Sequence, residues 1–134
     1  MVAKPKLLVV GKSEETSVVL REALANRVAE VFSARGVSRG LELAHSHSPE
    51  LIVVDLDCEP AQTATVAEGF RSAQELNAGS IVFLGAARQE SACDGRAEQG
   101  STAFVRKPYH FGPLIRKIEE LLAHCEQTSA RRAA

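Results

Sequence analysis

Two ionisable residues of opposite charge stand at the ends of apolar stretches of this sequence. Asp55 follows the apolar run LIVV, and Lys107 follows the stretch TAFVR and precedes Pro108. A carboxylate can serve as a nucleophile, or it can be kept ionised in an ion pair with a neighbouring lysine. The sequence therefore raises the question whether Asp55 reacts or is only held in a salt bridge.

Five apolar stretches predict the strands that must position these residues, at 6–10, 29–34, 50–55, 80–84 and 102–106. The runs KLLVV and ELIVVD contain almost no polar residue, as expected for strands that are buried on both faces. Ser13 can cap a helix after the first strand. Apolar residues at helical spacing predict that helix and three others, through Val19 and Leu24, Val37 and Leu41, Val66 and Phe70, and Leu114 and Ile118. A polar stretch at about 89–98 is the fifth helix candidate.

The alternation of strands and helices predicts an α/β domain with a parallel sheet covered on both faces. Sites in such domains lie beyond the carboxyl ends of the strands, which is where Asp55 and Lys107 are expected. We predict one domain over residues 1–126. Residues 127–134 have no apolar anchor and are expected to form a flexible tail or a linker.

Composition limits the classes of function that are open to the chain. Its 134 residues suit a single core, and its formal net charge of -1 argues against binding nucleic acid through a basic face. No apolar run is long enough to span a membrane, and the N-terminus lacks a signal peptide, so we expect a cytoplasmic location. Cys58, Cys93 and Cys125 fit neither a disulfide framework nor a zinc pattern. We expect them to be reduced, small apolar side chains.

Taken together, the residues at the strand ends resemble the receiver domain of two-component response regulators over roughly residues 5–124. Asp55 and Gly85 are 30 residues apart (85 − 55), and Gly85 and Lys107 are 22 apart (107 − 85). Both intervals are similar to the family's spacing, and FVRKP resembles the end of its fifth strand. The resemblance implies a flavodoxin-like, doubly wound fold with five parallel strands in the order 2-1-3-4-5 and five helices. It also implies that Asp55 is at the phospho-acceptor position, that Lys107 is the phosphate-binding lysine, that Gly85 and Phe104 are at the switch positions, and that Pro108 follows a cis peptide.

The sequence departs from the family pattern at the positions that would hold Mg²⁺. Gly11 and Lys12 replace the acidic pair after the first strand, and Gly85 replaces a hydroxyl residue. Mg²⁺ is usually held through one or two carboxylates, and only Asp55 and the backbone of Asp57 remain of the family's ligand set. We therefore expect neither a metal nor another cofactor, and Asp55 and Asp57 are the residues that could still contribute to a metal site.

The same departures suggest how the site is rearranged. We expect Lys12 to pair with Asp55 from one side while Lys107 pairs with it from the other. The alternative is that Lys12 points into solvent, as most lysines do. Because Gly85 leaves more room behind the fifth strand, we expect the ring of Phe104 to be held inward.

We predict an atypical receiver domain, a pseudo-receiver, which is not an enzyme and acts in signalling through protein contacts that are independent of phosphorylation. Its partners would be other signalling proteins, such as a histidine kinase or an effector domain, with a weak, polar homodimer as a further expectation. One alternative is a receiver that accepts a phosphoryl group at Asp55 with reduced dependence on Mg²⁺. A second alternative is a sensor that binds a small anion or a nucleotide in the vacated pocket.

Overall fold

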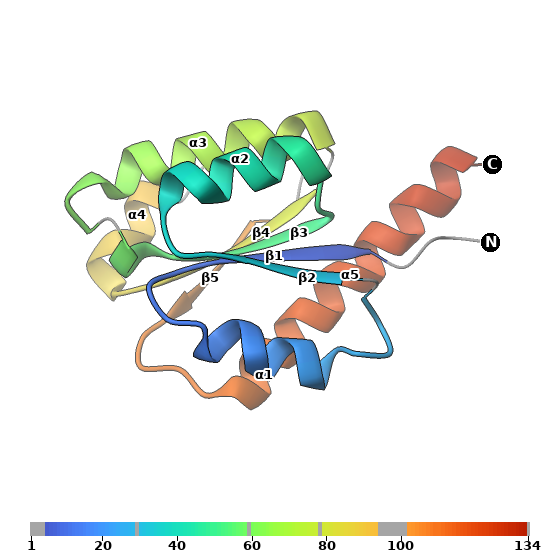
Figure 1. The fold of residues 1–134 in the computed structure, drawn as a ribbon, viewed down its shortest axis with the longest axis horizontal. Helices are drawn as coiled ribbons and strands as arrows, with labels where there is room; N and C mark the ends of the chain where they lie inside the picture. The colour runs from blue at the N-terminus through green and yellow to red at the C-terminus, as the bar shows by residue number, and fades with distance from the viewer. Residues whose placement is uncertain (1–4, 29, 59, 78, 94–101, 134) are drawn as a thin grey trace.

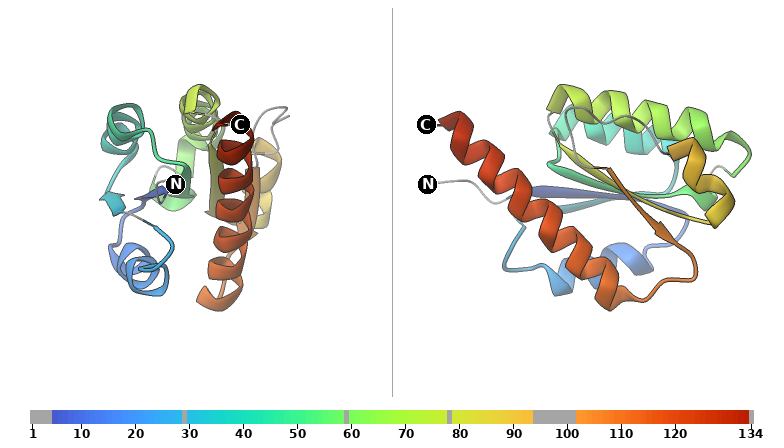
Figure 2. Two further views of the ribbon diagram at one scale, coloured as in Figure 1. Left: turned by 90° about the vertical axis from the view of Figure 1, so that its right-hand side faces the viewer. Right: turned by 180° about the vertical axis from the view of Figure 1, so that it is seen from behind.

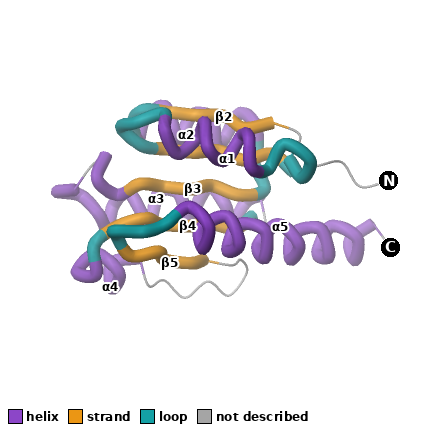
Figure 3. Tube along the Cα trace, turned by 90° about the horizontal axis from the view of Figure 1, so that it is seen from below, coloured by secondary structure: helices purple, strands orange, loops and turns teal. Residues whose placement is uncertain are grey.

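The strands of this computed structural model, which describes residues 5–28, 30–58, 60–77, 79–93 and 102–133, form one parallel sheet. The strands are β1 (Lys6–Val10), β2 (Glu30–Ala34), β3 (Leu51–Asp55), β4 (Ser80–Gly85) and β5 (Thr102–Arg106). They lie in the order β2-β1-β3-β4-β5, and every pair is parallel. Figure 3 shows this order from below. The predicted fold class and strand order are confirmed.

Helices cover both faces of the sheet (Figure 1). They are α1 (Glu15–Ala23), α2 (Val37–His47), α3 (Thr63–Asn77), α4 (Glu90–Cys93) and α5 (Phe111–Ala133). The pair α2 and α3 covers one face, and the pair α1 and α5 covers the other. Short 3₁₀ turns, η1 (Leu56–Cys58), η2 (Pro60–Gln62) and η3 (Ala87–Gln89), lie in the connections after β3 and β4.

The central strands are apolar throughout because their two faces contribute to two separate cores. Leu8 and Val10 of β1 belong to the core under α2 and α3. Leu7 and Val9 belong to the core under α1 and α5. Alternate side chains of a strand point to opposite faces of the sheet, so a strand covered on both sides needs an unbroken apolar run. The serine expected to cap α1 lies one residue before the N-cap, which is Glu14 and has no side-chain capping bond. The hydroxyl of Ser13 still accepts a hydrogen bond of 3.1 Å from the backbone N–H of Glu15, the first residue of α1.

One helix extends past its expected end, and the expected end of another lies outside the described residues. The described part of the fourth helix is Glu90–Cys93, and residues 94–98 of its expected range lie outside the described residues. The helix α5 continues to Ala133, past the boundary expected at residue 126. Figure 2 shows that its C-terminal part extends beyond the sheet. No helix within the described ranges is long and apolar enough to cross a membrane.

Cys93 illustrates the role expected for the cysteines. Its side chain is in the core under α2 and α3 and is only 2% exposed. Burial raises the pKa of its thiol to about 11, although the charge of Arg71 acts in the opposite direction. Cys93 is therefore an unreactive apolar side chain at neutral pH. The side chains of Cys58 and Cys125 lie outside the described residues.

Candidate functional site at the carboxyl ends of the strands

The structure brings Asp55 and Lys107 together at the carboxyl edge of the sheet. The Nζ atom of Lys107 lies 2.7 Å from Oδ1 of Asp55 and 2.6 Å from Oδ2 of Asp57. The same Oδ1 atom accepts a hydrogen bond of 3.0 Å from the backbone N–H of Asp57. One ammonium group therefore neutralises part of the charge of two carboxylates, and one oxygen of Asp55 already has two donors. Asp57 is thus a second partner of Lys107, a role that the sequence analysis did not assign to Asp57.

The backbone of Lys107 is held next to the end of β4. The N–H of Lys107 donates a hydrogen bond of 2.9 Å to the carbonyl oxygen of Gly85, which continues the pairing of β4 with β5 by one residue. The peptide bond between Lys107 and Pro108 is cis, which confirms that part of the prediction. The lysine side chain is about a quarter exposed, at 27%.

The surroundings of Lys107 alter its protonation equilibrium. Burial acts to lower the pKa of Lys107. The hydrogen bonds and negative charges of Asp55 and Asp57 outweigh this effect and hold the pKa above its ordinary value of 10.5. The ammonium form is therefore stabilised in the folded state relative to the unfolded state.

Replacing Lys107 with methionine, which removes the charge but keeps an unbranched side chain, is expected to lower the free energy of unfolding by about 1 kcal/mol. The pKa of the lysine is higher in the folded state than in the unfolded state, so its contribution is fully present below pH about 10.5. The contribution is lost as the pH rises through the folded-state value. Urea unfolding of both proteins at about pH 8 and about pH 11 should show a difference that shrinks at the higher pH. Lys117→Met, at an exposed lysine of α5, is the control, and a difference that is the same at both pH values would contradict the expectation.

The two residues after β1 leave the other side of Asp55 without an acid. Gly11 is buried, and a Cβ atom placed on it would lie 3.2 Å from Cβ of Asp55. Lys12 is exposed, and among the described residues no ion pair joins it to Asp55. The pair expected between Lys12 and Asp55 is therefore not formed here. Lys12 lies in the loop beyond β1 and is exposed to solvent, while Lys107 and the N–H of Asp57 already bond to Oδ1 of Asp55.

The described residues at this edge offer a Mg²⁺ ion two neighbouring carboxylates, those of Asp55 and Asp57. Within the described parts of the chain, no group of three or more histidine, cysteine, aspartate or glutamate side chains is placed to hold a metal. Gly11 offers no side-chain oxygen, and Lys12 brings a positive charge. Mg²⁺ prefers oxygen ligands in a near-octahedral shell, and Asp55 and Asp57 are both engaged by an ammonium group.

Neighbouring side chains fill the space beside Gly85 at the end of β4. A Cβ atom on Gly85 would lie 3.3 Å from Cζ of Phe104 and 3.0 Å from Cδ1 of Leu56. The Phe104 ring therefore reaches the backbone of Gly85 and packs against the core under α2 and α3. Its position agrees with the inward orientation expected from the sequence. Phe104 remains partly exposed, as do the described neighbours on its edge strand.

Comparison with known proteins relates this arrangement to a family. The chain is 27% identical over 124 residues to the KDP operon transcriptional regulatory protein KdpE of Escherichia coli (strain K12). That match covers 92% of the chain and 54% of KdpE, so the chain spans about half the length of this curated relative. No family profile matches the sequence.

Solved receiver structures have the same fold at low sequence identity. A CheY-like response regulator receiver domain protein from Methanospirillum hungatei JF-1 is 18% identical, with a TM-score of 0.73 over 94% of this chain and 99% of that one. A response regulator receiver modulated diguanylate cyclase from Pelobacter carbinolicus is also 18% identical, with a TM-score of 0.71 over 94% of this chain and 98% of that one. The chain has the fold of CheY-like response-regulator receiver domains, and its sequence is similar to that of a response regulator.

The domain also contains a polar side chain at the site that the sequence reasoning missed. Gln89 is 5% exposed, and its Oε1 atom accepts a hydrogen bond of 2.8 Å from the backbone N–H of Ala86. A glutamine three residues after the first residue of a helical turn commonly reaches back to that residue's N–H. The spacing of Ala86 and Gln89 is therefore a usable signal, although Ala86 lies before the stretch of about 89–98 in which the sequence predicts the fifth helix.

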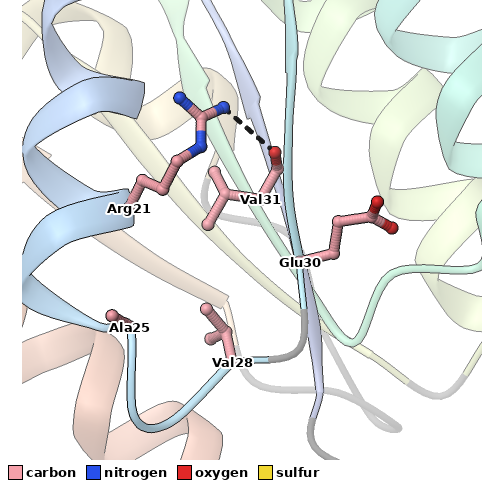
Figure 4. Close-up of a pocket in the computed structure, with 5 residues that line it drawn as sticks. All are labelled: Arg21, Ala25, Val28, Glu30 and Val31. Carbon is pink, nitrogen blue, oxygen red and sulfur yellow. Dashed lines mark hydrogen bonds between the residues drawn. The ribbon is translucent and has the colours of Figure 1, made fainter.

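A surface pocket lies away from Asp55, between the C-terminal end of α1 and β2 (Figure 4). Its lining residues are Arg21, Ala25, Val28, Glu30 and Val31. The guanidinium of Arg21 donates a hydrogen bond of 3.2 Å to the carbonyl oxygen of Val31, and Figure 4 shows Glu30 pointing away from it. The charged groups of this pocket do not converge on a common point, in contrast to those around Lys107.

Proposed function

We propose that this receiver domain is a pseudo-receiver, a signalling module that binds other proteins without phosphorylation of Asp55. The observation that carries the proposal is the pair of residues after β1. A buried glycine is packed against Asp55, and an exposed lysine follows it. In working receivers, by the resemblance described above, acids at these positions hold the divalent cation. An acyl phosphate forms between two anions, and without a divalent cation their repulsion is offset less, chiefly by Lys107 among the described residues that contact Asp55.

Under this proposal the domain is not an enzyme, needs no Mg²⁺ or other cofactor, and acts in the cytoplasm. Its partners are other signalling proteins, such as a histidine kinase or an effector domain. The surface formed by α4, β5 and α5 supports a polar type of contact. Arg106 of β5 and Glu90 of α4 form an exposed ion pair of 2.7 Å across it. A contact between two copies through this surface would accordingly be weak.

A receiver that still accepts a phosphoryl group at Asp55 is the second candidate. One observation favours it: Lys107 lies 2.7 Å from Asp55, at the position of the family's phosphate-binding lysine. The two candidates differ in a single measurable event, which is whether Asp55 takes up a phosphoryl group from a small donor.

Incubation with acetyl phosphate and Mg²⁺ is expected to leave the mass of the intact protein unchanged. Transfer of a phosphoryl group would add about 80 Da. Mass spectrometry should be run in parallel on the natural protein and on the Asp55→Asn and Asp57→Asn variants. An adduct that persists in Asp57→Asn but disappears in Asp55→Asn would establish the second candidate and end the pseudo-receiver proposal.

A further inference from the structure

Gln89 joins two connections that are distant in the sequence. Its Oε1 atom accepts the N–H of Ala86, directly after β4, at 2.8 Å. Its Nε2 atom donates a hydrogen bond of 3.2 Å to Oγ1 of Thr63, the first residue of α3. Both ends of one buried carboxamide are therefore used: one is bonded to the connection after β4 and the other to the first residue of α3.

Gly85 provides the space in which this carboxamide lies. A Cβ atom built on Gly85 would lie 2.6 Å from Oε1 of Gln89, closer than atoms in contact can approach. The same Cβ would lie close to Leu56 and to the ring of Phe104. The volume next to Gly85 is therefore filled by Gln89 from one side and by Phe104 from another, and a larger residue at position 85 would compete with both.

We propose that Gln89 acts as an internal clasp: its side-chain hydrogen bonds keep the connection after β4 in one conformation. Gly85, which has no side chain, leaves the space that the Gln89 carboxamide occupies. The carboxamide supplies the acceptor for the Ala86 N–H, so this donor needs no external anion or water. The second hydrogen bond ties the same side chain to the start of α3, so an outward turn of the Gln89 side chain breaks both bonds. This inference goes beyond the proposed function, because it concerns the unphosphorylated protein and holds whatever Asp55 does.

The energetic basis of the clasp is the burial of its polar groups. A buried amide that loses its partner carries a desolvation penalty as well as the lost hydrogen bond. If Gln89 turned outward, the Ala86 N–H would lose its acceptor and the space beside Gly85 would be left empty. The inward orientation therefore satisfies a donor and fills a cavity at the same time.

Hydrogen exchange of the Ala86 amide tests the clasp directly. In Gln89→Ala and in Gln89→Met, which keeps the side-chain length but cannot accept the bond well, the Ala86 amide should exchange at least about fivefold faster than in the natural protein. Arg88→Ala is the matched control, because Arg88 lies on the same turn with an exposed side chain. Unchanged exchange at Ala86 in both Gln89 variants, measured by NMR, would overturn the proposal. So would an equal increase in Arg88→Ala.

The fit between Gly85 and Gln89 is tested by combining substitutions at the two positions. Gly85→Ala should lower the melting temperature in the natural background, and by clearly less in the Gln89→Ala background, where the nearest obstructing atom has been removed. The contacts with Leu56 and Phe104 remain in both backgrounds and cancel in the comparison. Additive effects of the two substitutions would show that Gly85 does not serve to admit Gln89. Neither measurement involves phosphorylation, so their failure would be distinct from failure of the pseudo-receiver proposal.

Discussion

Replacing Lys12 with aspartate is expected to strengthen the binding of Mg²⁺ at Asp55 about a hundredfold. The substitution changes the local charge by two units next to a divalent cation. Two unit charges about 4 Å apart interact by about 1 kcal/mol in water, so this change amounts to about 3 kcal/mol after allowance for distance and screening. Lys12 is exposed and has no ion pair with any described residue, so its replacement breaks no ion pair among the described residues. Position 12 is preferred to position 11 because a side chain on Gly11 would press against Asp55.

Calorimetric titration with MgCl₂ at low ionic strength measures this gain. Lys117→Asp is the matched control: it gives the same net charge, -3 in place of -1 (−1 − 2 = −3), but lies on α5, where Lys117 is paired with Glu120 at 3.6 Å. Only the change at position 12 should strengthen the binding. An equal gain in both variants would mean that overall charge governs the binding. No gain in either would mean that Lys12 is not what weakens the metal site.

The parts of the fold that could be predicted are the strands in which every residue lies in the same kind of environment. β1 and β3 are buried on both faces, so nearly every residue in them must be apolar, and this run is visible in the sequence. The proximity of Asp55 and Lys107 follows from the same regularity. Parallel strands end at one edge of the sheet, and Asp55 and Lys107 lie at or just past the ends of β3 and β5.

The parts that could not be predicted depend on the course of a loop or on one side chain. The direction of Lys12 is set by the backbone after β1, which no periodicity describes. The two bonds of Gln89 depend on how closely the connection after β4 approaches α3. The continuation of α5 past residue 126 has a simpler cause. The sequence EQTSARRA lacks an apolar face but contains mostly residues that are compatible with a helix.

Two helical glycines are expected to respond in opposite directions when replaced by alanine. Gly40 of α2 lies against the sheet: a Cβ atom there would be 2.8 Å from Cγ2 of Val10 and 2.9 Å from Cζ of Phe70. Gly40→Ala should therefore lower the free energy of unfolding by about 1–2 kcal/mol, since the overpacking of a filled core outweighs the gain in helix propensity. Gly69 of α3 has room, because its Cβ would be 3.6 Å from the two Cδ atoms of Leu41. Gly69→Ala should raise the free energy of unfolding by about 0.5–1 kcal/mol.

Urea unfolding of the two variants separates packing from propensity, because the chemical change is the same at both positions. A stabilised Gly40→Ala would show that α2 can move away from Val10 at no cost. The distance between α2 and the sheet would then not be set by this contact. If Gly40→Ala is destabilising as expected, Phe70→Leu, which shortens the opposing side chain, should reduce its effect, because Phe70 and Gly40 compete for one space. Val10 directly precedes Gly11, so the packing of Gly40 against Val10 also helps to fix the end of β1 beside Asp55.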